Sequence, residues 1–217
     1  MQLLVVYYSR TGMTRGIARV IASKLRCDVE EIVDLKYFGK DAFQGKLTEI
    51  REIKKDPALY EVVFIGTPIL KNVISSAIGT FIHKNKDRLK RVAFFCAGGS
   101  EDIVFREMEL LCEKTPIATL SLRKGDMKKS GYITKIEEFA TDAPALLVSD
   151  LLERTDKTAS KAPLKNLLEL RQECECVYEL VRKVSDSIVR KQELMDCMLI
   201  VDDQLNMAID RLEEKRS

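Results

Sequence analysis

Short apolar runs alternate with segments of helical periodicity over the first 153 residues. The apolar runs predict five strands, at residues 2–8, 29–33, 60–66, 91–97 and 117–122, with Thr67-Pro68 ending the third. Helical spacing predicts helices at residues 17–25, 74–85, 101–113 and 132–153, and a weak one at 47–55. The pattern leaves open whether Pro144 interrupts the last helix. Strands that are apolar on both faces predict an α/β fold, a doubly wound parallel sheet in the order 2-1-3-4-5.

A polar loop, Ser9-Arg10-Thr11-Gly12-Met13-Thr14, joins the first predicted strand to the first predicted helix. A loop that enters a helix amino terminus points free N–H groups at one spot, with the positive end of the helix dipole behind them. Hydroxyl groups of Ser9, Thr11 and Thr14 add donors, and Gly12 lets the backbone approach a ligand closely. The loop therefore predicts a site for a phosphate monoester, with a serine-capped turn as the alternative.

The Ser-x-Thr-Gly-x-Thr spacing resembles the FMN-binding signature of the flavodoxin family. Two later loops are similar to that family's loops after the third and fourth strands: Gly66-Thr67-Pro68-Ile69-Leu70-Lys71-Asn72 and Cys96-Ala97-Gly98-Gly99-Ser100. The resemblance covers roughly residues 1–125 and implies a flavodoxin-like fold that holds FMN. It implies that the residues binding FMN are Ser9, Arg10, Thr11, Gly12, Met13, Thr14, Thr67, Pro68, Ile69, Leu70, Lys71, Asn72, Cys96, Ala97, Gly98, Gly99 and Ser100.

A second resemblance concerns residues 69–85. This segment is similar to one in the flavodoxin-like branch that includes menaquinone-dependent protoporphyrinogen dehydrogenase. The match lies in Phe81-Ile82-His83-Lys84-Asn85 and in the two phenylalanines of the next apolar strand, Phe94-Phe95. It implies that this branch is the nearest part of the family.

Two features depart from the electron-carrier flavodoxins. Those carriers generally stack the flavin ring on an aromatic residue, and neither 67–72 nor 97–101 contains one. They are also usually acidic, whereas residues 1–162 hold 27 basic and 22 acidic side chains, a net charge of +5. Lys71 is placed to stabilise reduced flavin, or is simply a solvated lysine. No catalytic residue is assigned, because the cofactor supplies the chemistry.

Composition excludes several classes of protein. No apolar run approaches the ~20 residues that span a bilayer, and the amino terminus looks like a buried strand and not a secretion signal. A net charge of +2 gives no reason to expect nucleic acid as a partner. Six cysteines without a C-x-x-C pair and the single His83 predict reduced thiols, no metal site and a cytoplasmic location.

The carboxyl-terminal quarter has a different pattern. A polar linker at 154–163 is expected to separate an FMN-binding domain, 1–153, from a helical segment, 164–217. In the helical segment, all but Lys191 and Asp202 of the fourteen heptad a and d positions are apolar. The fourteen positions are Leu167, Leu170, Cys174, Val177, Val181, Val184, Ile188, Lys191, Met195, Met198, Asp202, Leu205, Ile209 and Leu212. This predicts a coiled coil, a continuous helix of roughly 75–80 Å that pairs two copies in a homodimer. The alternative is a hairpin broken near Lys191.

Together these features predict an FMN-binding protein that transfers electrons. It would exchange them with a redox partner protein, or reduce a quinone-like or other small acceptor. The alternative is a non-catalytic scaffold, in which a degenerate flavodoxin-like domain is attached to a coiled coil that binds partners.

Overall fold

The computed structural model describes residues 2–37, 45–70, 72–98, 101–129, 131–158, 162–184 and 190–214. The chain divides into two units, residues 2–140 and residues 141–217, called here the sheet unit and the helical unit. None of the helices in the described ranges combines the length and apolar character that crossing a membrane would require.

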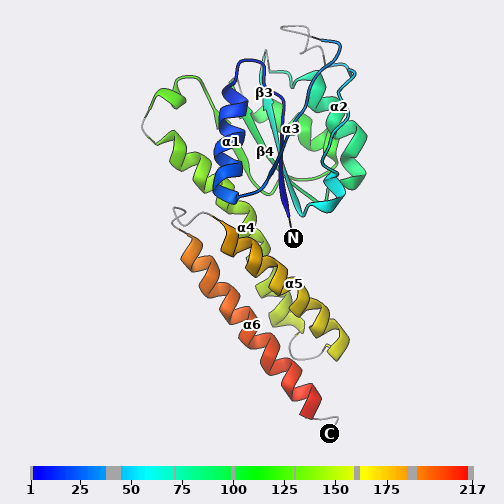
Figure 1. Ribbon diagram of the computed structural model, residues 1–217, viewed down its shortest axis with the longest axis vertical. Coiled ribbons are helices and arrows are strands. Elements are labelled where there is room, and N and C mark those ends of the chain that lie inside the picture. Colours follow the sequence, from blue (N-terminus) through cyan, green and yellow to red (C-terminus); the bar gives the residue numbers. More distant parts are fainter. Residues whose placement is uncertain are drawn as a thin grey trace. The chain divides into compact units, whose positions relative to one another are not determined.

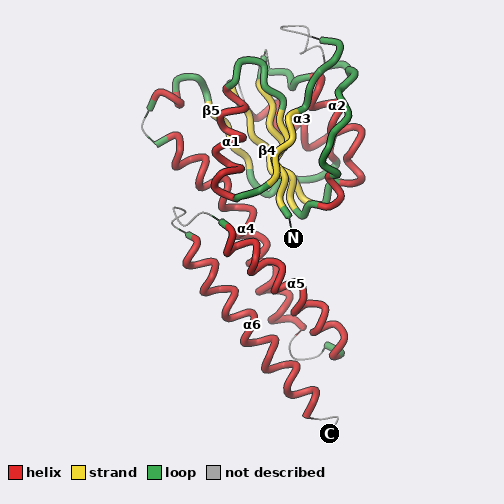
Figure 2. The backbone as a smooth tube through the Cα atoms, viewed as in Figure 1, coloured by secondary structure: helices red, strands yellow, loops and turns green. Residues whose placement is uncertain are grey.

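Five parallel strands form the sheet, in the order β2-β1-β3-β4-β5 (Figure 2). They are β1 Leu3–Tyr7, β2 Asp28–Glu31, β3 Val62–Pro68, β4 Arg91–Ala97 and β5 Thr119–Leu122. Every residue of β1 and β3 is buried, as expected for central strands covered on both faces. The predicted fold class and strand order are confirmed, and the carboxyl ends of all five strands meet at one edge of the sheet.

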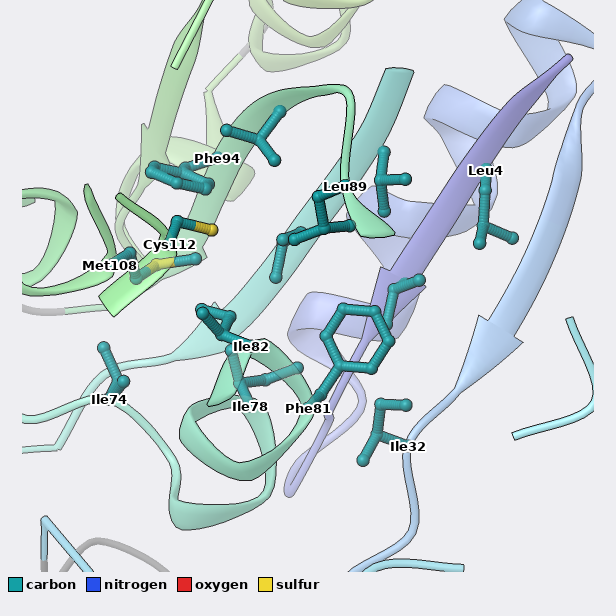
Figure 3. Packing of buried hydrophobic residues seen from close by; sticks show 14 of the residues in the cluster. Leu4, Ile32, Ile74, Ile78, Phe81, Ile82, Leu89, Phe94, Met108 and Cys112 are labelled. Atoms are coloured by element: carbon teal, nitrogen blue, oxygen red, sulfur yellow. The ribbon is translucent and has the colours of Figure 1, made fainter. Parts of the chain in front are cut away.

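Helices cover both faces of this sheet (Figure 1). They are α1 Met13–Leu25 on one face, and α2 Ser76–Asn85 and α3 Glu101–Cys112 on the other. Beneath α2 and α3, side chains from the strands and both helices form one apolar cluster, which includes Leu4, Phe81, Phe94 and Met108 (Figure 3). The described part of the unit also contains three short 3-10 helices: η1 Pro57–Leu59, η2 Lys86–Arg88 and η3 Asp126–Lys128.

On the α1 side of the sheet, three phenylalanines fill the space over β3 and β4. The ring of Phe139 meets Phe64 edge-on at a centroid distance of 5.6 Å and Phe95 at 6.3 Å. Gly66 pairs with Phe95 across the two strands. A Cβ atom on residue 66 would lie 2.1 Å from a carbon of the Phe95 ring, so the packing of this face requires glycine there.

Several predicted elements are corrected. The weak helix at 47–55 is wrong: its backbone is tied to distant residues, since Leu35 N–H donates to Glu49 O (2.8 Å) and Thr48 N–H to Thr80 Oγ1 (2.8 Å). β3 does not stop before Thr67-Pro68 but includes both residues. A proline is tolerated there because Pro68 is the last residue of the strand and pairs only with β4, so no β1 residue needs its missing N–H group. β2, Asp28–Glu31, and β5, Thr119–Leu122, are shorter than the strands predicted at 29–33 and 117–122, and β2 begins one residue earlier.

Helix α4, Tyr132–Thr158, begins in the sheet unit and continues into the helical unit. Pro144 does not interrupt it. The neighbouring Ala143 and Leu147 are buried, so their packing outweighs the hydrogen bond that proline cannot make. Residues 154–158, predicted as linker, belong to the same helix.

In the helical unit, α5 Leu164–Lys183 and α6 Lys191–Glu214 pack against each other (Figure 1). Their buried residues recur at spacings of three and four, the spacing of a helix–helix seam. They are Leu167, Leu170, Cys174, Val177, Leu180 and Val181 on α5, and Leu194, Met198, Val201, Leu205, Ala208 and Ile209 on α6. Arg154 of α4 donates two hydrogen bonds to the carboxylate of Glu173 on α5, at 2.8 and 2.7 Å.

The continuous helix predicted for 164–217 is therefore wrong, and the hairpin alternative is confirmed. Val184 leaves the helical conformation (φ −57°, ψ 143°), and Lys191 Nζ donates to the carbonyls of Arg182 (2.9 Å) and Val184 (2.7 Å) at the end of α5. Asp202, a predicted seam position on α6, is partly exposed, and the preceding residue Val201 is buried instead. Because α5 and α6 cover each other's apolar stripe, that stripe no longer requires a second copy. The homodimer stays a prediction.

Replacing Tyr60 with phenylalanine is expected to lower the free energy of unfolding by about 1 kcal/mol at pH 7, since the carboxylate that it bonds is partly exposed. The Tyr60 hydroxyl donates to Asp28 Oδ2 (2.6 Å), and Lys55 Nζ to Oδ1 (2.9 Å). These two bonds lower the pKa of Asp28 below its ordinary value. Their contribution is therefore complete above the unfolded pKa of about 3.9 and is lost as the pH falls through the folded pKa.

Urea unfolding from pH 7 down to pH 2.5 measures this effect. The difference between wild type and Tyr60→Phe should shrink at the acidic end. Tyr37→Phe is the control, because the Tyr37 hydroxyl makes no hydrogen bond within the described residues. A difference that stays constant with pH would contradict the assigned pair.

Candidate functional site

A pocket of about 420 Å³ lies at the carboxyl edge of the sheet. Its lining comes from the loops after β1, β3 and β4 and from the chain that follows β5: Arg10, Thr11, Met13, Pro68, Ile69, Ala97, Gly98 and Lys124. The structure thus brings together all three loops that the sequence assigns to one ligand. The volume lies within the range of small-molecule and cofactor sites.

The loop after β1 combines a serine cap with unused donors. Ser9 Oγ accepts hydrogen bonds from the N–H groups of Gly12 (3.1 Å) and Arg15 (3.2 Å). The serine-capped turn, the alternative to a phosphate site, is thus present. It does not use every donor, however: the N–H groups of Met13 and Thr14, in the first turn of α1, have no partner among the described residues. The buried hydroxyl of Thr14 has none either.

Gly12 immediately precedes α1 in a left-handed conformation, with φ +90°. Glycine adopts this conformation without strain, and a Cβ atom there would have no neighbour within 4 Å. Open space at residue 12, beside unpartnered N–H groups and an unpartnered hydroxyl, is the environment in which a helix amino terminus binds an anion. The residues present therefore fit a phosphate group.

The loop after β3 is stabilised by hydrogen bonds between residues 67 and 75. Thr67 is completely buried, and its Oγ1 donates to Pro68 O (3.0 Å) and accepts from Ser75 N–H (3.1 Å). Leu70 and Asn72 form a tight turn, in which Val73 N–H donates to Leu70 O (3.2 Å) and Asn72 has φ +61°. Pro68 and Ile69 line the pocket, whereas Thr67, Leu70 and Asn72 support that wall without lining it. Lys71 lies outside the described residues.

The loop after β4 supplies backbone to the pocket. Ala97 and Gly98 line it, and Gly98 has φ +90°. Cys96 is completely buried in β4 and does not reach the lining. Two hydrogen bonds join the three neighbouring segments: Ile69 N–H donates to Ala97 O (3.0 Å) and Gly98 N–H to Leu122 O (3.0 Å). Gly99 and Ser100 lie outside the described residues.

The charged side chains of the lining, Arg10 and Lys124, are both basic. Neither pairs with a carboxylate in the part of the chain that the structure describes. Arg15, by contrast, is neutralised by Glu31 at 2.6 Å. Burial, followed by the charge of Asp34, raises the pKa of Tyr8, so this phenol stays neutral beside the loop. The pocket therefore presents positive charge and suits an anionic ligand.

Lys124 was missed by the sequence analysis. It follows the last residue of β5 by two positions, and the carboxyl ends of the strands in such folds surround the ligand. That placement was the available signal. The predicted residues Ser9, Gly12 and Thr14 belong to the loop after β1, residues 9–14, called here the phosphate loop. They shape this loop but are not part of the pocket lining.

Comparison with known proteins finds a matching family model. The family model described as a flavodoxin domain matches residues 4–137. No curated protein matches the chain. The finer resemblance, to the branch that includes menaquinone-dependent protoporphyrinogen dehydrogenase, stays a prediction.

Similar solved structures include a flavoprotein from Lactobacillus acidophilus in complex with FMN, with 18% identity, 55% of this chain and 92% of that chain covered, and a TM-score of 0.47. Another is oxidised flavodoxin 1 from Bacillus cereus, at 14% identity, 65% and 96% coverage and a TM-score of 0.42. A third is a WrbA-like flavodoxin from Agrobacterium tumefaciens, at 14% identity, 64% and 95% coverage and a TM-score of 0.41.

Proposed function

Because this chain belongs to the flavodoxin domain family, we propose that it binds FMN at the carboxyl edge of the sheet and uses it to reduce a small acceptor. The observation that carries this proposal is the set of unused donors at the start of α1. The N–H groups of Met13 and Thr14 and the buried hydroxyl of Thr14 point to a phosphate as their missing partner.

The remaining lining suits the flat part of the cofactor. Pro68, Ile69, Ala97 and Gly98 offer an apolar surface and close backbone beyond the phosphate loop. Arg10 and Lys124 add positive charge that attracts the phosphate and other anionic groups. When bound, FMN supplies electron-transfer chemistry, and the protein's part is to hold and orient it. No histidine, cysteine or carboxylate belongs to the described lining. The role of the described lining residues is therefore to bind and position the cofactor and not to transfer protons.

Two features favour a reductase of small acceptors over an electron carrier. Within the described lining there is no aromatic side chain to cover a flavin ring, which leaves room for a flat acceptor. The sequence also places no aromatic residue at 71, 99 or 100. In addition, residues 1–162 carry a net charge of +5, whereas electron-carrier flavodoxins are usually acidic.

Purified protein is expected to be yellow and to release FMN when it is denatured. Isothermal titration of the apoprotein should show FMN bound at least about 100-fold more tightly than riboflavin, because riboflavin lacks the phosphate that the loop holds. A colourless protein that does not bind added FMN would overturn the proposal and support the scaffold alternative. Equal affinity for both ligands would overturn the assignment of the loop.

Anaerobic reduction separates a reductase from a carrier. Reduction is expected in a single two-electron step, followed by rapid reoxidation with a water-soluble benzoquinone. Two well-separated one-electron steps, with slow reoxidation by the quinone, would support the carrier and a redox partner protein instead.

For the helical unit we propose that two copies pair through the outward face of α6. Leu199, Ile200 and Met207 on this helix are 53%, 52% and 53% exposed, respectively. Large apolar side chains gathered on one exposed surface favour association. Sedimentation equilibrium at micromolar concentrations tests the pairing, and a monomer at all concentrations would contradict it.

A further inference from the structure

On the basis of the FMN site proposed above, we propose that Lys124 stabilises the two-electron-reduced cofactor in its singly protonated, anionic form. The proposal assigns to Lys124 the part that the sequence suggested for Lys71. It rests on where Lys124 lies in the pocket, on the use already made of neighbouring donors, and on the charge of the lining.

The strand order places Lys124 far from the phosphate loop. From β1 the sheet continues through β3 and β4 to β5, and adjacent strands lie about 4.8 Å apart. The end of β5 is therefore roughly 14 Å from the end of β1. Arg10 follows β1 and Lys124 follows β5, yet both line one pocket. If α1 holds the phosphate, Lys124 faces the part of the ligand that lies beyond β3 and β4.

Two backbone donors on the described segments near Lys124 are already occupied. Ile69 N–H donates to Ala97 O and Gly98 N–H donates to Leu122 O, each at 3.0 Å. The ammonium of Lys124 makes no hydrogen bond or ion pair with the described residues. It is therefore the donor with a full positive charge that remains available at this end of the described lining.

The charge balance of reduction explains why this position matters. An oxidised flavin ring is neutral, and two electrons with one proton give it one negative charge. Two electrons with two protons leave it neutral. A cation beside the ring lowers the free energy of the charged form, and no carboxylate of the described lining offsets that cation. Lys124 therefore favours uptake of a single proton.

The test compares Lys124→Gln with wild type. Lys128→Gln is the matched control, since Lys128 is also an exposed lysine of the segment after β5 but does not line the pocket. Each protein, loaded with FMN, is titrated anaerobically with dithionite at pH 6 to 9. Each dithionite ion, with water, supplies two electrons and becomes two bisulfite ions. Absorbance spectra against a reference dye give the two-electron potential.

Lys124→Gln is expected to bind reduced FMN about fivefold to tenfold more weakly, relative to oxidised FMN, than wild type does. That ratio lowers the two-electron potential by about 20–30 mV. The wild-type potential should fall by about 30 mV per pH unit, which corresponds to one proton for two electrons. In the variant, the steeper dependence expected for two protons should extend to higher pH. Lys128→Gln should match wild type, and 0.5 M KCl should reduce the difference because salt screens exposed charges.

If Lys124→Gln binds FMN and keeps both the wild-type potential and its pH dependence, the inference is overturned while the proposed function stands. A loss in Lys128→Gln equal to that in Lys124→Gln would overturn it as well, by pointing to general surface charge. If wild type itself fails to bind FMN, the proposed function and this inference fall together.

Discussion

Gly66→Ala is expected to lower the free energy of unfolding of the sheet unit by about 3 kcal/mol, at the upper end of the usual cost of overpacking. The new Cβ atom would lie 2.1, 2.2 and 2.8 Å from three carbons of the Phe95 ring. That ring is completely buried and packs on Phe139, so it has little space into which it can move. Both residues lie on central strands, whose backbones are fixed by neighbours on each side. Urea unfolding followed by far-ultraviolet circular dichroism measures the loss.

A double-mutant cycle with Phe95→Ala identifies the cause of that loss. Phe95→Ala alone should cost about 3–5 kcal/mol, because it leaves a cavity. In that background Gly66→Ala should cost less than about 1 kcal/mol, since the atoms that it would overlap are gone. An equal cost of Gly66→Ala in both backgrounds would show that overlap with Phe95 is not responsible.

Gly12→Asp is expected to weaken FMN binding at least about 100-fold. The added carboxylate would stand at the start of α1, close to the N–H groups of Met13 and Thr14 that we assign to the phosphate. Like charges brought together in a binding site cost several kcal/mol. The fold should tolerate the change, since a Cβ atom at residue 12 has no neighbour within 4 Å and aspartate is among the residues that adopt positive φ.

Gly12→Asn is the matched control, because asparagine has nearly the same shape and the same tolerance of positive φ without the charge. It should lose no more than about tenfold in affinity, as measured by isothermal titration. Both variants should unfold within about 1–2 kcal/mol of wild type, the strain of one left-handed residue. Equal losses of FMN affinity in the two variants would show that negative charge at residue 12 does not oppose the ligand.

The elements that the sequence predicts well are those specified by local pattern. β4 was predicted at its observed bounds, Arg91–Ala97, because its apolar run carries its own signal. By contrast, the conformation of the segment at 47–55 depends on residues that are distant in sequence. Its hydrogen-bond partners are residues near Asp34 and Thr80, which no short window of sequence contains. There, tertiary contacts outweigh helix propensity.

The helical hairpin shows a different limit of sequence analysis. No glycine or proline marks the end of α5, so the apolar pattern of a bent and of a continuous helix is nearly the same. Three predicted heptad positions of α6, Met198, Leu205 and Ile209, are buried as expected. Two others are replaced by the residue before them: Leu194 and Val201 are buried, whereas Met195 and Asp202 are partly exposed. Lys191, one of the two polar residues in the predicted seam, donates hydrogen bonds to the carbonyls at the end of α5.

Seven of the eight described lining residues belong to the three loops that the sequence assigned to the ligand, and Lys124 is the exception. Lys124 has no local motif, since its place in the pocket follows from the position of β5 at the end of the sheet and not from its neighbours in sequence. Equally, Thr67 belongs to a recognisable loop, but burial and the bond to Ser75 direct it into the wall. A motif identifies a loop, whereas packing decides which side chains face the ligand.

The strand order also determines how the sheet can assemble during synthesis. β1 lies between β2 and β3, so when the chain has left the ribosome as far as residue 31 only one side of β1 can be paired. Its other side stays open until β3 emerges, with the chain as far as residue 68. At roughly 5–20 residues per second this is a wait of a few seconds, during which a bare apolar strand edge is exposed to other chains.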